Sequence, residues 1–290
     1  MRSPDSFQAQ QGYFAFAQNT QETNYLELAY AQALSIKNTQ KINKYAVAVD
    51  GETKKLITDE HRTVFDYVID IDSPDAHAMN NEWQAWHLTP FKETVKLESD
   101  ILFTTNVDHW WTGMRLQEVC FTTKIRNYEG TVSYARDYRK LFDENILPNI
   151  YTGMYYFRFG RVSMELFQLA EAVYANWSLF RDQLLKNCRE DLPSTDVVFA
   201  VAAKILGEEL CTNPALDYPG FVHMKGAING IASSADWQDV YHAELQDNHL
   251  MINFTRQQWP VHYYQKTFIN ERIRTKLISS FSKLQSRKAN

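Results

Sequence analysis

The chain has 290 residues, of which 44% are hydrophobic, 14% aromatic and 22% charged. This composition is globular, and it excludes a disordered, collagen-like or coiled-coil protein. The formal net charge of −5 argues at first against a nucleic-acid partner. No run of 18 apolar residues occurs and the first residues carry no apolar signal segment, so we expect no membrane partner and a cytoplasmic location.

The first half of the chain predicts alternating strands and helices. A short aromatic run over 13–17 is typical of a buried strand, 24–36 predicts an amphipathic helix, and 45–49 a second strand. Further strands are predicted over 65–71 and 94–97. Because a β-α-β order indicates parallel pairing, we predict an α/β protein with a Rossmann-type open mixed sheet flanked by helices.

The second half of the chain is predicted to be more helical. Apolar residues recur every three or four positions over 163–185 and again over 195–206. A basic amphipathic helix is predicted over roughly 267–284. We therefore expect one main domain, residues 1–249, and a basic C-terminal helical extension, residues 250–290, packed on the same domain.

The most informative stretch is 89–108, TPFKETVKLESDILFTTNVD. A strand that ends at Leu97 delivers Glu98, Ser99 and Asp100 to the carboxyl edge of the sheet, where open α/β sheets bind ligands. Residues i and i+2 of an extended segment point the same way, so both carboxylates can face one Mg²⁺ or Mn²⁺ ion. Such an ion makes a diphosphate a better leaving group. The alternative is an exposed acidic turn without a ligand.

This stretch resembles the acidic-motif region of the GT-A glycosyltransferases, which transfer sugars from nucleotide diphospho-sugars. Glu98 stands where that family usually has Asp, and its longer side chain could reach a metal, a bridging water or the sugar. The matching residues are Thr89, Pro90, Phe91, Glu93, Thr94, Leu97, Asp100, Ile101 and Leu102.

Two further segments resemble the donor-binding parts of this family. The strand over 13–17 and the following helix look like its first β-α unit, which implies that the loop between them holds the nucleotide base and ribose. The late segment 221–226, FVHMKG, implies a metal ligand at His223 and a diphosphate contact at Lys225. An imidazole can complete a carboxylate site, and lysine supplies a point charge for phosphate. A structural histidine is the alternative for His223.

Two more segments resemble the sugar and acceptor side of the family's site. Residues 149–155, NIYTGMY, look like the segment that lines the acceptor side of the donor sugar. Ser194, Thr195 and Asp196 look like the segment whose acidic residue touches the sugar or acceptor. Asp196 lies near a predicted helix start, so a capping role is the alternative.

The resemblance implies a metal-dependent glycosyltransferase that moves a hexose or pentose from a nucleotide sugar, expected to be UDP-linked, to a hydroxyl acceptor. It implies Mn²⁺ or Mg²⁺ as cofactor, bound by Asp100 and His223 with help from Glu98. It implies catalytic roles for Glu98, Asn149 and Asp196. The donor-binding residues that it implies are Ala17, Gln18, Asn19, Thr20, Ser99, Lys225 and Gly226.

The acceptor prediction depends on an uneven distribution of charge. Residues 250–290 carry +7 and the other 249 residues −12. Basic residues mixed with aromatic ones suit phosphate contact and base stacking. A second cluster of this kind comprises Lys124, Arg126, Tyr128, Tyr134, Arg136, Tyr138, Arg139 and Lys140.

The helix segment 24–40, NYLELAYAQALSIKNTQ, resembles phage-encoded DNA-modifying glycosyltransferases. With the basic clusters, this resemblance implies hydroxymethylated cytosine in DNA as the acceptor, and a host-cytoplasm location for a phage enzyme. The alternatives are a glycan or protein hydroxyl as the acceptor, or a nucleotide-sugar-binding protein without catalysis. A solvated helix is the alternative for the basic C-terminal segment.

Overall fold

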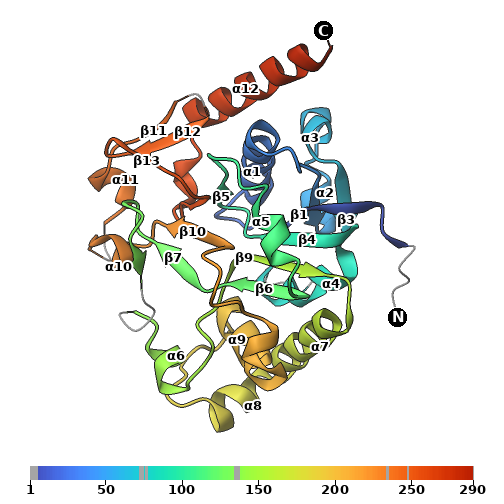
Figure 1. The fold of residues 1–290 in the computed structure, drawn as a ribbon, viewed down its shortest axis with the longest axis vertical. Helices are drawn as coiled ribbons and strands as arrows, with labels where there is room; N and C mark the ends of the chain where they lie inside the picture. Colours follow the sequence, from blue (N-terminus) through green and yellow to red (C-terminus); the bar gives the residue numbers. More distant parts are fainter. Residues whose placement is uncertain are drawn as a thin grey trace.

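The computed structural model describes residues 6–71, 75, 78–133, 138–232, 235–246 and 248–289. Its largest sheet has six strands in the order β3-β2-β1-β4-β9-β6 (Figure 1). The first four are mutually parallel, and β9 is antiparallel to both β4 and β6. The bounds are β1 (Ala9–Phe16), β2 (Tyr45–Val49), β3 (Tyr67–Asp70), β4 (Phe91–Leu97), β9 (Tyr151–Arg158) and β6 (Val119–Thr122).

A second sheet has five short strands in the order β5-β14-β10-β7-β8. Because β5 follows β4 after three residues, the two sheets are joined at the acidic turn. Its strands are β5 (Ile101–Leu102), β14 (Val261–His262), β10 (Gly220–His223), β7 (Lys124–Arg126) and β8 (Val132–Ser133). A separate antiparallel meander comprises β11 (Ala243–Gln246), β12 (His249–Ile252) and β13 (Thr255–Arg256).

Helices cover both faces of the six-stranded sheet (Figure 1). One face carries α1 (Tyr25–Thr39) and α3 (Asp59–Val64), with α12 (Glu271–Ala289) packed on the outside of α1; the other carries α7 (Arg161–Ala175), α9 (Thr195–Leu206) and the 3₁₀ helix η2 (Ala78–Gln84). The shorter helical segments are α2 (Gly51–Lys54), α4 (Ala85–Leu88), α5 (Trp110–Met114), α6 (Lys140–Glu144), α8 (Trp177–Leu179), the π turn η4 (Phe180–Leu184), η5 (Glu208–Leu210), α10 (Gly226–Asn229), α11 (Trp237–Val240) and η6 (Lys266–Phe268).

The alternation of side chains along the strands creates two apolar cores. Tyr13 and Ala15 of β1 pack toward α1, whereas Phe14 and Phe16 pack toward α7 and α9. Both faces are covered, so β2 is buried at all five positions and is apolar without alternation, as central parallel strands are.

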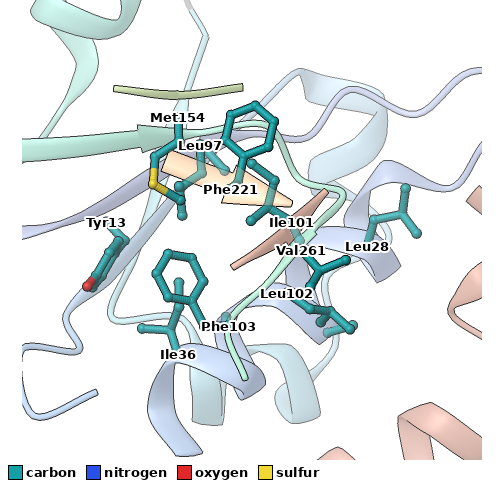
Figure 2. Close-up of a cluster of buried hydrophobic side chains, with 14 of the residues drawn as sticks. Tyr13, Leu28, Ile36, Leu97, Ile101, Leu102, Phe103, Met154, Phe221 and Val261 are labelled. Carbon is teal, nitrogen blue, oxygen red and sulfur yellow. The ribbon is translucent and has the colours of Figure 1, made fainter. Parts of the chain in front are cut away.

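The core on the α1 side continues into the second sheet. Figure 2 shows apolar side chains from both sheets and from α1 gathered below the acidic turn. This shared core fixes the position of the second sheet against the first. The labelled members are Tyr13, Leu28, Ile36, Leu97, Ile101, Leu102, Phe103, Met154, Phe221 and Val261.

The predicted open mixed sheet flanked by helices is confirmed, but one long helix is not. The helix predicted over 163–185 is wrong in its second part, because α7 ends at Ala175 and two short turns follow. The side-chain amide of Asn176 donates to the carbonyl of Ala172 at 2.8 Å. Asparagine competes in this way with the backbone pattern of a helix, which favours a helix end.

The C-terminal segment takes part in the sheets. Residues beyond 249 form β12, β13, β14 and α12, and β14 lies between β5 and β10. Helix α12 packs on α1 through Ile273 and Leu277. In the described residues, no helix combines the length and apolar character needed to cross a membrane.

Four of the eight basic side chains in this segment are paired with carboxylates. Each ion pair joins the segment to an earlier part of the chain. It also neutralises a basic side chain that would otherwise be available to bind a polyanion. The pairs are Lys266 with Asp100, Arg272 and Lys276 with Glu244, and Arg274 with Glu27 and Glu60.

One ion-pair cluster holds α1 against the strands that it covers. Asp66 accepts from Lys37 at 2.5 Å, from Lys44 at 2.8 Å and from the backbone N–H of Tyr45 at 2.8 Å. Burial raises the pKa of Asp66, but both lysines and the amide outweigh burial and lower it. The cluster is therefore stabilising when Asp66 is ionised.

We expect Asp66→Asn to lower the free energy of unfolding at neutral pH by about 1–3 kcal/mol, because two ammonium groups lose their anionic partner and one of the two acceptor oxygens is replaced by an NH₂ donor. A depressed folded-state pKa contributes stability above the unfolded pKa and loses it as the pH falls. Urea denaturation should therefore show a difference between wild type and variant that shrinks below the ordinary Asp pKa of about 3.9. A difference independent of pH would contradict this assignment.

Candidate active site

The acidic turn after β4 is held by a buried glutamine of α1. The side-chain amide of Gln32, fully buried, donates to the carbonyls of Glu98 at 2.6 Å and Ile101 at 3.0 Å, and its oxygen accepts from the hydroxyl of Tyr45 at 2.8 Å. On the other side, the N–H of Glu98 donates to the carbonyl of Gly153 at 2.8 Å. The turn is thus fixed from α1 and from β9.

Strand β14 brings a histidine to this turn from far along the chain. It pairs antiparallel with β5 so that His262 lies opposite Ile101. His262 Nε2 lies 2.9 Å from Asp100 Oδ2 and 3.3 Å from Glu98 Oε2. Glu98, Asp100 and His262 each offer a ligand atom, and these atoms lie within 4.8 Å of one another.

The electrostatics of this cluster favour an ionised Asp100. Burial raises the pKa of Asp100, which is 2% exposed, but the charges and hydrogen bonds of His262 and Lys266 outweigh burial and lower it. Burial lowers the pKa of His262, and Asp100 and Glu98 raise it above its usual value. Burial and the charge of Asp100 raise the pKa of Glu98, in spite of His262.

These residues fit a divalent cation. Two carboxylates and an imidazole form a donor set that suits Mn²⁺ or Mg²⁺. The buried carboxylate of Asp100 contacts two basic side chains, His262 and Lys266, so it is stabilised by positive charge. A bound ion would supply that charge and leave Lys266 available for another anion.

A cavity of about 200 Å³ opens beside the cluster. Of the predicted donor-binding residues, Gln18 and Ser99 line it, together with Glu98, Asp100 and Lys266. Ala17 is buried directly after the end of β1. Asn19 and Thr20 build the β1–α1 loop: Asn19 Oδ1 accepts from the N–H of Leu26 at 2.9 Å, and Thr20 Oγ1 from the N–H of Thr23 at 3.0 Å.

A second cavity, of about 480 Å³, lies at the start of α9: Asp196 lines this cavity, whereas the preceding residue, Thr195, lines the first. Asp196 accepts from the N–H of Thr152 at 2.8 Å and from its hydroxyl at 2.7 Å. It also pairs with Arg139 at 2.9 Å. In the structure Asp196 therefore links α9 to β9.

Arg139 brings two of the predicted catalytic residues together. Its Nη1 donates to Asn149 Oδ1 at 3.0 Å, while its Nη2 binds Asp196. Its guanidinium lies 3.5 Å from the ring centre of Phe142 and 4.2 Å from that of Tyr151. Asn149 and Asp196 are thus held around one buried arginine at the edge of the second cavity.

The late histidine segment lies next to the cluster. His223 stacks on His262 with ring centres 4.5 Å apart and an interplanar angle of 11°. Burial lowers the pKa of His223 well below its usual value, and the charges of His262 and Lys225 add to this. His223 is therefore a neutral ring that supports His262, outside the group of three ligand atoms found among the described residues.

Lys225 and Gly226 follow His223 on the side of the second cavity. Lys225 lines that cavity, with its ammonium 5.4 Å from the ring centre of Tyr138. A Cβ at Gly226 would lie 3.0 Å from the carbonyl oxygen of Ile231, so close packing explains this glycine. The lysine that contacts Asp100 is Lys266.

The sequence alone does not identify four side chains of the candidate site. His262 and Lys266 lie in the basic, aromatic C-terminal segment, and Arg139 lies in the second basic-aromatic cluster, of which Tyr134 and Arg136 lie outside the described residues. Gln32 lies within the helix predicted over 24–36, where no motif marks it. The available signal is a histidine at the end of a short strand with a lysine soon after it, which His262 with Lys266 shares with His223 and Lys225, although the spacing is four residues in the first pair and two in the second.

The sequence matches no protein-family model and no curated protein. Among solved structures, the fold is similar to that of the galactosyltransferase LgtC in complex with donor and acceptor sugar analogues. The TM-score is 0.56 at 10% identity, over 93% of this chain and 95% of that chain. The chain therefore has the GT-A glycosyltransferase fold.

Two further glycosyltransferase structures are less similar. Apo GlyE of Streptococcus pneumoniae TIGR4 has a TM-score of 0.48 at 11% identity, over 94% of this chain and 60% of that chain. Apo mouse xyloside xylosyltransferase 1 has a TM-score of 0.44 at 10% identity, over 70% of this chain and 84% of that chain. These likenesses add nothing to the resemblance to phage DNA-modifying enzymes.

The clamp formed by Gln32 predicts a selective effect on metal binding. Gln32→Leu leaves two buried carbonyls without donors, so we expect a loss of about 1–3 kcal/mol of stability and at least a tenfold weaker Mn²⁺ affinity. Gln40→Leu is the matched control, because Gln40 clamps Thr105 and Val107 farther along the same segment.

Calorimetric Mn²⁺ titration and urea denaturation of both variants test this prediction. Both variants should lose stability, and only Gln32→Leu should lose metal affinity. Equal loss of affinity in the two variants would show that the clamp on Glu98 has no special role.

Proposed function

We propose that the protein is a metal-dependent glycosyltransferase that moves a sugar from a nucleotide sugar to a hydroxyl acceptor. The observation that carries this proposal is the convergence of Glu98, Asp100 and His262 beside a cavity, which the two carboxylates line, in a GT-A fold. A divalent cation bound there would neutralise charge on the diphosphate leaving group.

Lys266 is the candidate for direct contact with the diphosphate. It lines the first cavity and already contacts the carboxylate of Asp100. Burial lowers the pKa of Lys266, but Asp100 and Glu98 outweigh burial and raise it, so the side chain stays cationic. The role expected for Lys225 from the sequence is thus better suited to Lys266, since Lys225 lies on the second cavity.

The loop after β1 is the candidate for holding the nucleoside. Gln18 and Tyr25 line the same cavity as Lys266, whose ammonium lies 5.8 Å from the ring centre of Tyr25. UDP is the donor nucleotide we propose to test first. Asn149 and Asp196, fixed by Arg139, would position the sugar and the acceptor on the side of the second cavity.

Metal binding by this cluster is the first test. We expect Asp100→Asn and His262→Ala to weaken Mn²⁺ affinity at least 100-fold, since each removes a ligand, and His223→Ala to weaken it about tenfold, as loss of a supporting contact does. Asp108→Asn is the control, because Asp108 caps a nearby loop through Lys41 and Ile42. If His223→Ala weakens Mn²⁺ affinity as much as His262→Ala does, His223 is itself a metal ligand, as the sequence resemblance implies.

Turnover is the second part of the same test. Wild type with Mn²⁺ should release UDP from at least one of UDP-glucose, UDP-galactose and UDP-xylose, and chelation or Asp100→Asn should abolish this. Metal-dependent binding of UDP-sugars without any release would favour the non-catalytic binding protein. Full activity of Asp100→Asn would refute the site.

The acceptor is a separate question. Hydroxymethylated cytosine in DNA is one hypothesis, and a glycan or protein hydroxyl is the other. The DNA hypothesis depends on basic side chains, and those at the end of α12, Lys283 and Arg287, have no ion pair in the described part of the chain. The experiment must keep His262 in place, so it changes these two residues and does not truncate the chain.

If DNA is the acceptor, the double variant Lys283→Gln/Arg287→Gln should bind duplex DNA more weakly. The salt dependence of log K should lose up to about two units of slope, one for each phosphate contact. Lys54→Gln/Lys55→Gln, which changes two exposed lysines at the C-terminal end of the short helix α2, is the charge-matched control. Unchanged affinity and an unchanged salt slope would show that Lys283 and Arg287 of α12 do not contact DNA.

A further inference from the structure

A fully buried lysine lies on the central strand that leads to the acidic turn. Lys96 of β4 is 0% exposed, and it precedes Glu98 by two residues, so both side chains leave the strand on the same side. Lysine is almost never fully buried unless it is paired. Its ammonium contacts the carboxylate oxygen Oε2 of Glu82, a residue of η2 that is 8% exposed.

The carboxylate of Glu82 has two unequal oxygens. Oε2 is shielded from solvent and faces Lys96. The other oxygen, Oε1, accepts no hydrogen bond from any residue that the structure describes. Glu82 also lines the first cavity, together with Glu98, Ser99 and Asp100. Only Oε2 is shielded from solvent, so the carboxylate has one oxygen held by the Lys96 ammonium and one oxygen, Oε1, that is open to a hydroxyl group of a ligand in the cavity.

The charges around the cavity indicate which part of a donor molecule would meet this oxygen. Three carboxylates line the cavity, Glu82, Glu98 and Asp100, and its one cationic lining residue among those described is Lys266, which contacts Asp100. A phosphate group is attracted to the side of Lys266 and of a bound cation, and it is repelled by Glu82. A neutral group rich in hydroxyls suits the wall at Glu82.

We propose that Glu82 is a specificity-determining residue whose Oε1 accepts a hydrogen bond from one hydroxyl of the donor sugar, with Lys96 holding the carboxylate in place. This inference rests on the proposed function, because it assigns a part of the same site. A fixed carboxylate recognises a sugar hydroxyl strongly. A nucleotide sugar that lacks this hydroxyl leaves the carboxylate without its hydrogen bond when it binds.

The alternative is that the pair Glu82–Lys96 only positions Glu98. The two roles differ in what they do to different donors. A positioning role changes turnover of all donors by the same factor, whereas recognition of one hydroxyl changes only donors that carry it.

The test uses the UDP-sugar that wild type turns over and its monodeoxy analogues, one for each ring or exocyclic hydroxyl. Wild type should lose about 10- to 100-fold in kcat/KM on removal of one particular hydroxyl, as expected for a hydrogen bond to a charged acceptor. In Glu82→Met/Lys96→Met this penalty should vanish, because kcat/KM for the parent UDP-sugar should fall to the value for the analogue that lacks the recognised hydroxyl. Replacing both partners leaves no unpaired buried charge, so the fold should persist.

The control is Glu93→Met/Arg115→Met, which removes an ion pair at the other end of β4, away from the cavity. It should keep the wild-type pattern of penalties, and Mn²⁺ and UDP affinity should be unchanged in both double variants. If Glu82→Met/Lys96→Met does not fold, Glu82→Gln takes its place, and the penalty for the same hydroxyl should fall at least threefold.

A uniform drop in turnover with the same pattern of penalties would overturn the inference and leave the proposed function standing. Failure of wild type to turn over any nucleotide sugar would overturn the proposed function and this inference with it.

Discussion

The structure depends on one electrostatic constraint, the burial of an ionised carboxylate where two sheets meet. Asp100 is almost inaccessible to solvent, and an isolated carboxylate in such a place is strongly unfavourable. Its partners, His262 and Lys266, lie more than 160 positions farther along the chain. Bringing them there requires β14 to enter the second sheet beside β5, and this requirement makes the C-terminal segment part of the site.

The same constraint explains why the surroundings of the turn are rigid. Gln32 and Gly153 hold the backbone of the turn from opposite sides, and His223 stacks behind His262. Two discrete charges below the turn, Lys96 and Glu82, are buried as a pair. Burial raises the pKa of Glu82, and the neighbouring ammonium of Lys96 opposes this rise and favours the ionised carboxylate. A site built from fixed charges needs little rearrangement when a ligand with complementary charge enters, which is the condition for electrostatic stabilisation of a leaving group.

Much of the fold was predictable because its signals are local. The run over 45–49 is apolar at every position and forms the strand β2 with the same bounds, and the helix over 195–206 begins after Ser194 as expected. The acidic turn was also predictable, since it follows directly on a buried strand. The end of α7 was not, because a single Asn176 interrupts an otherwise regular apolar pattern.

The partners of the turn could not be found in the same way. Which of two histidines reaches Asp100 depends on the order of β5, β14 and β10 in a sheet, and strand order is a long-range property. His223 and His262 occupy paired positions on neighbouring strands, so local sequence does not distinguish them. The positive charge of the C-terminal segment also does not show, from sequence alone, whether it serves an external partner or the fold. In the structure, half of its basic side chains form ion pairs with acidic residues of the same molecule.

The most direct test of the account is the position of the metal. Crystals grown with Mn²⁺ and UDP, measured at the manganese absorption edge, should show one anomalous peak bonded to Asp100 and His262 at about 2.0–2.3 Å, in contact with a diphosphate oxygen. Lys266 should have moved from Asp100 toward the diphosphate. A peak at any other group of residues, or UDP bound with no peak at this cluster, would contradict the claim that these residues form the metal centre.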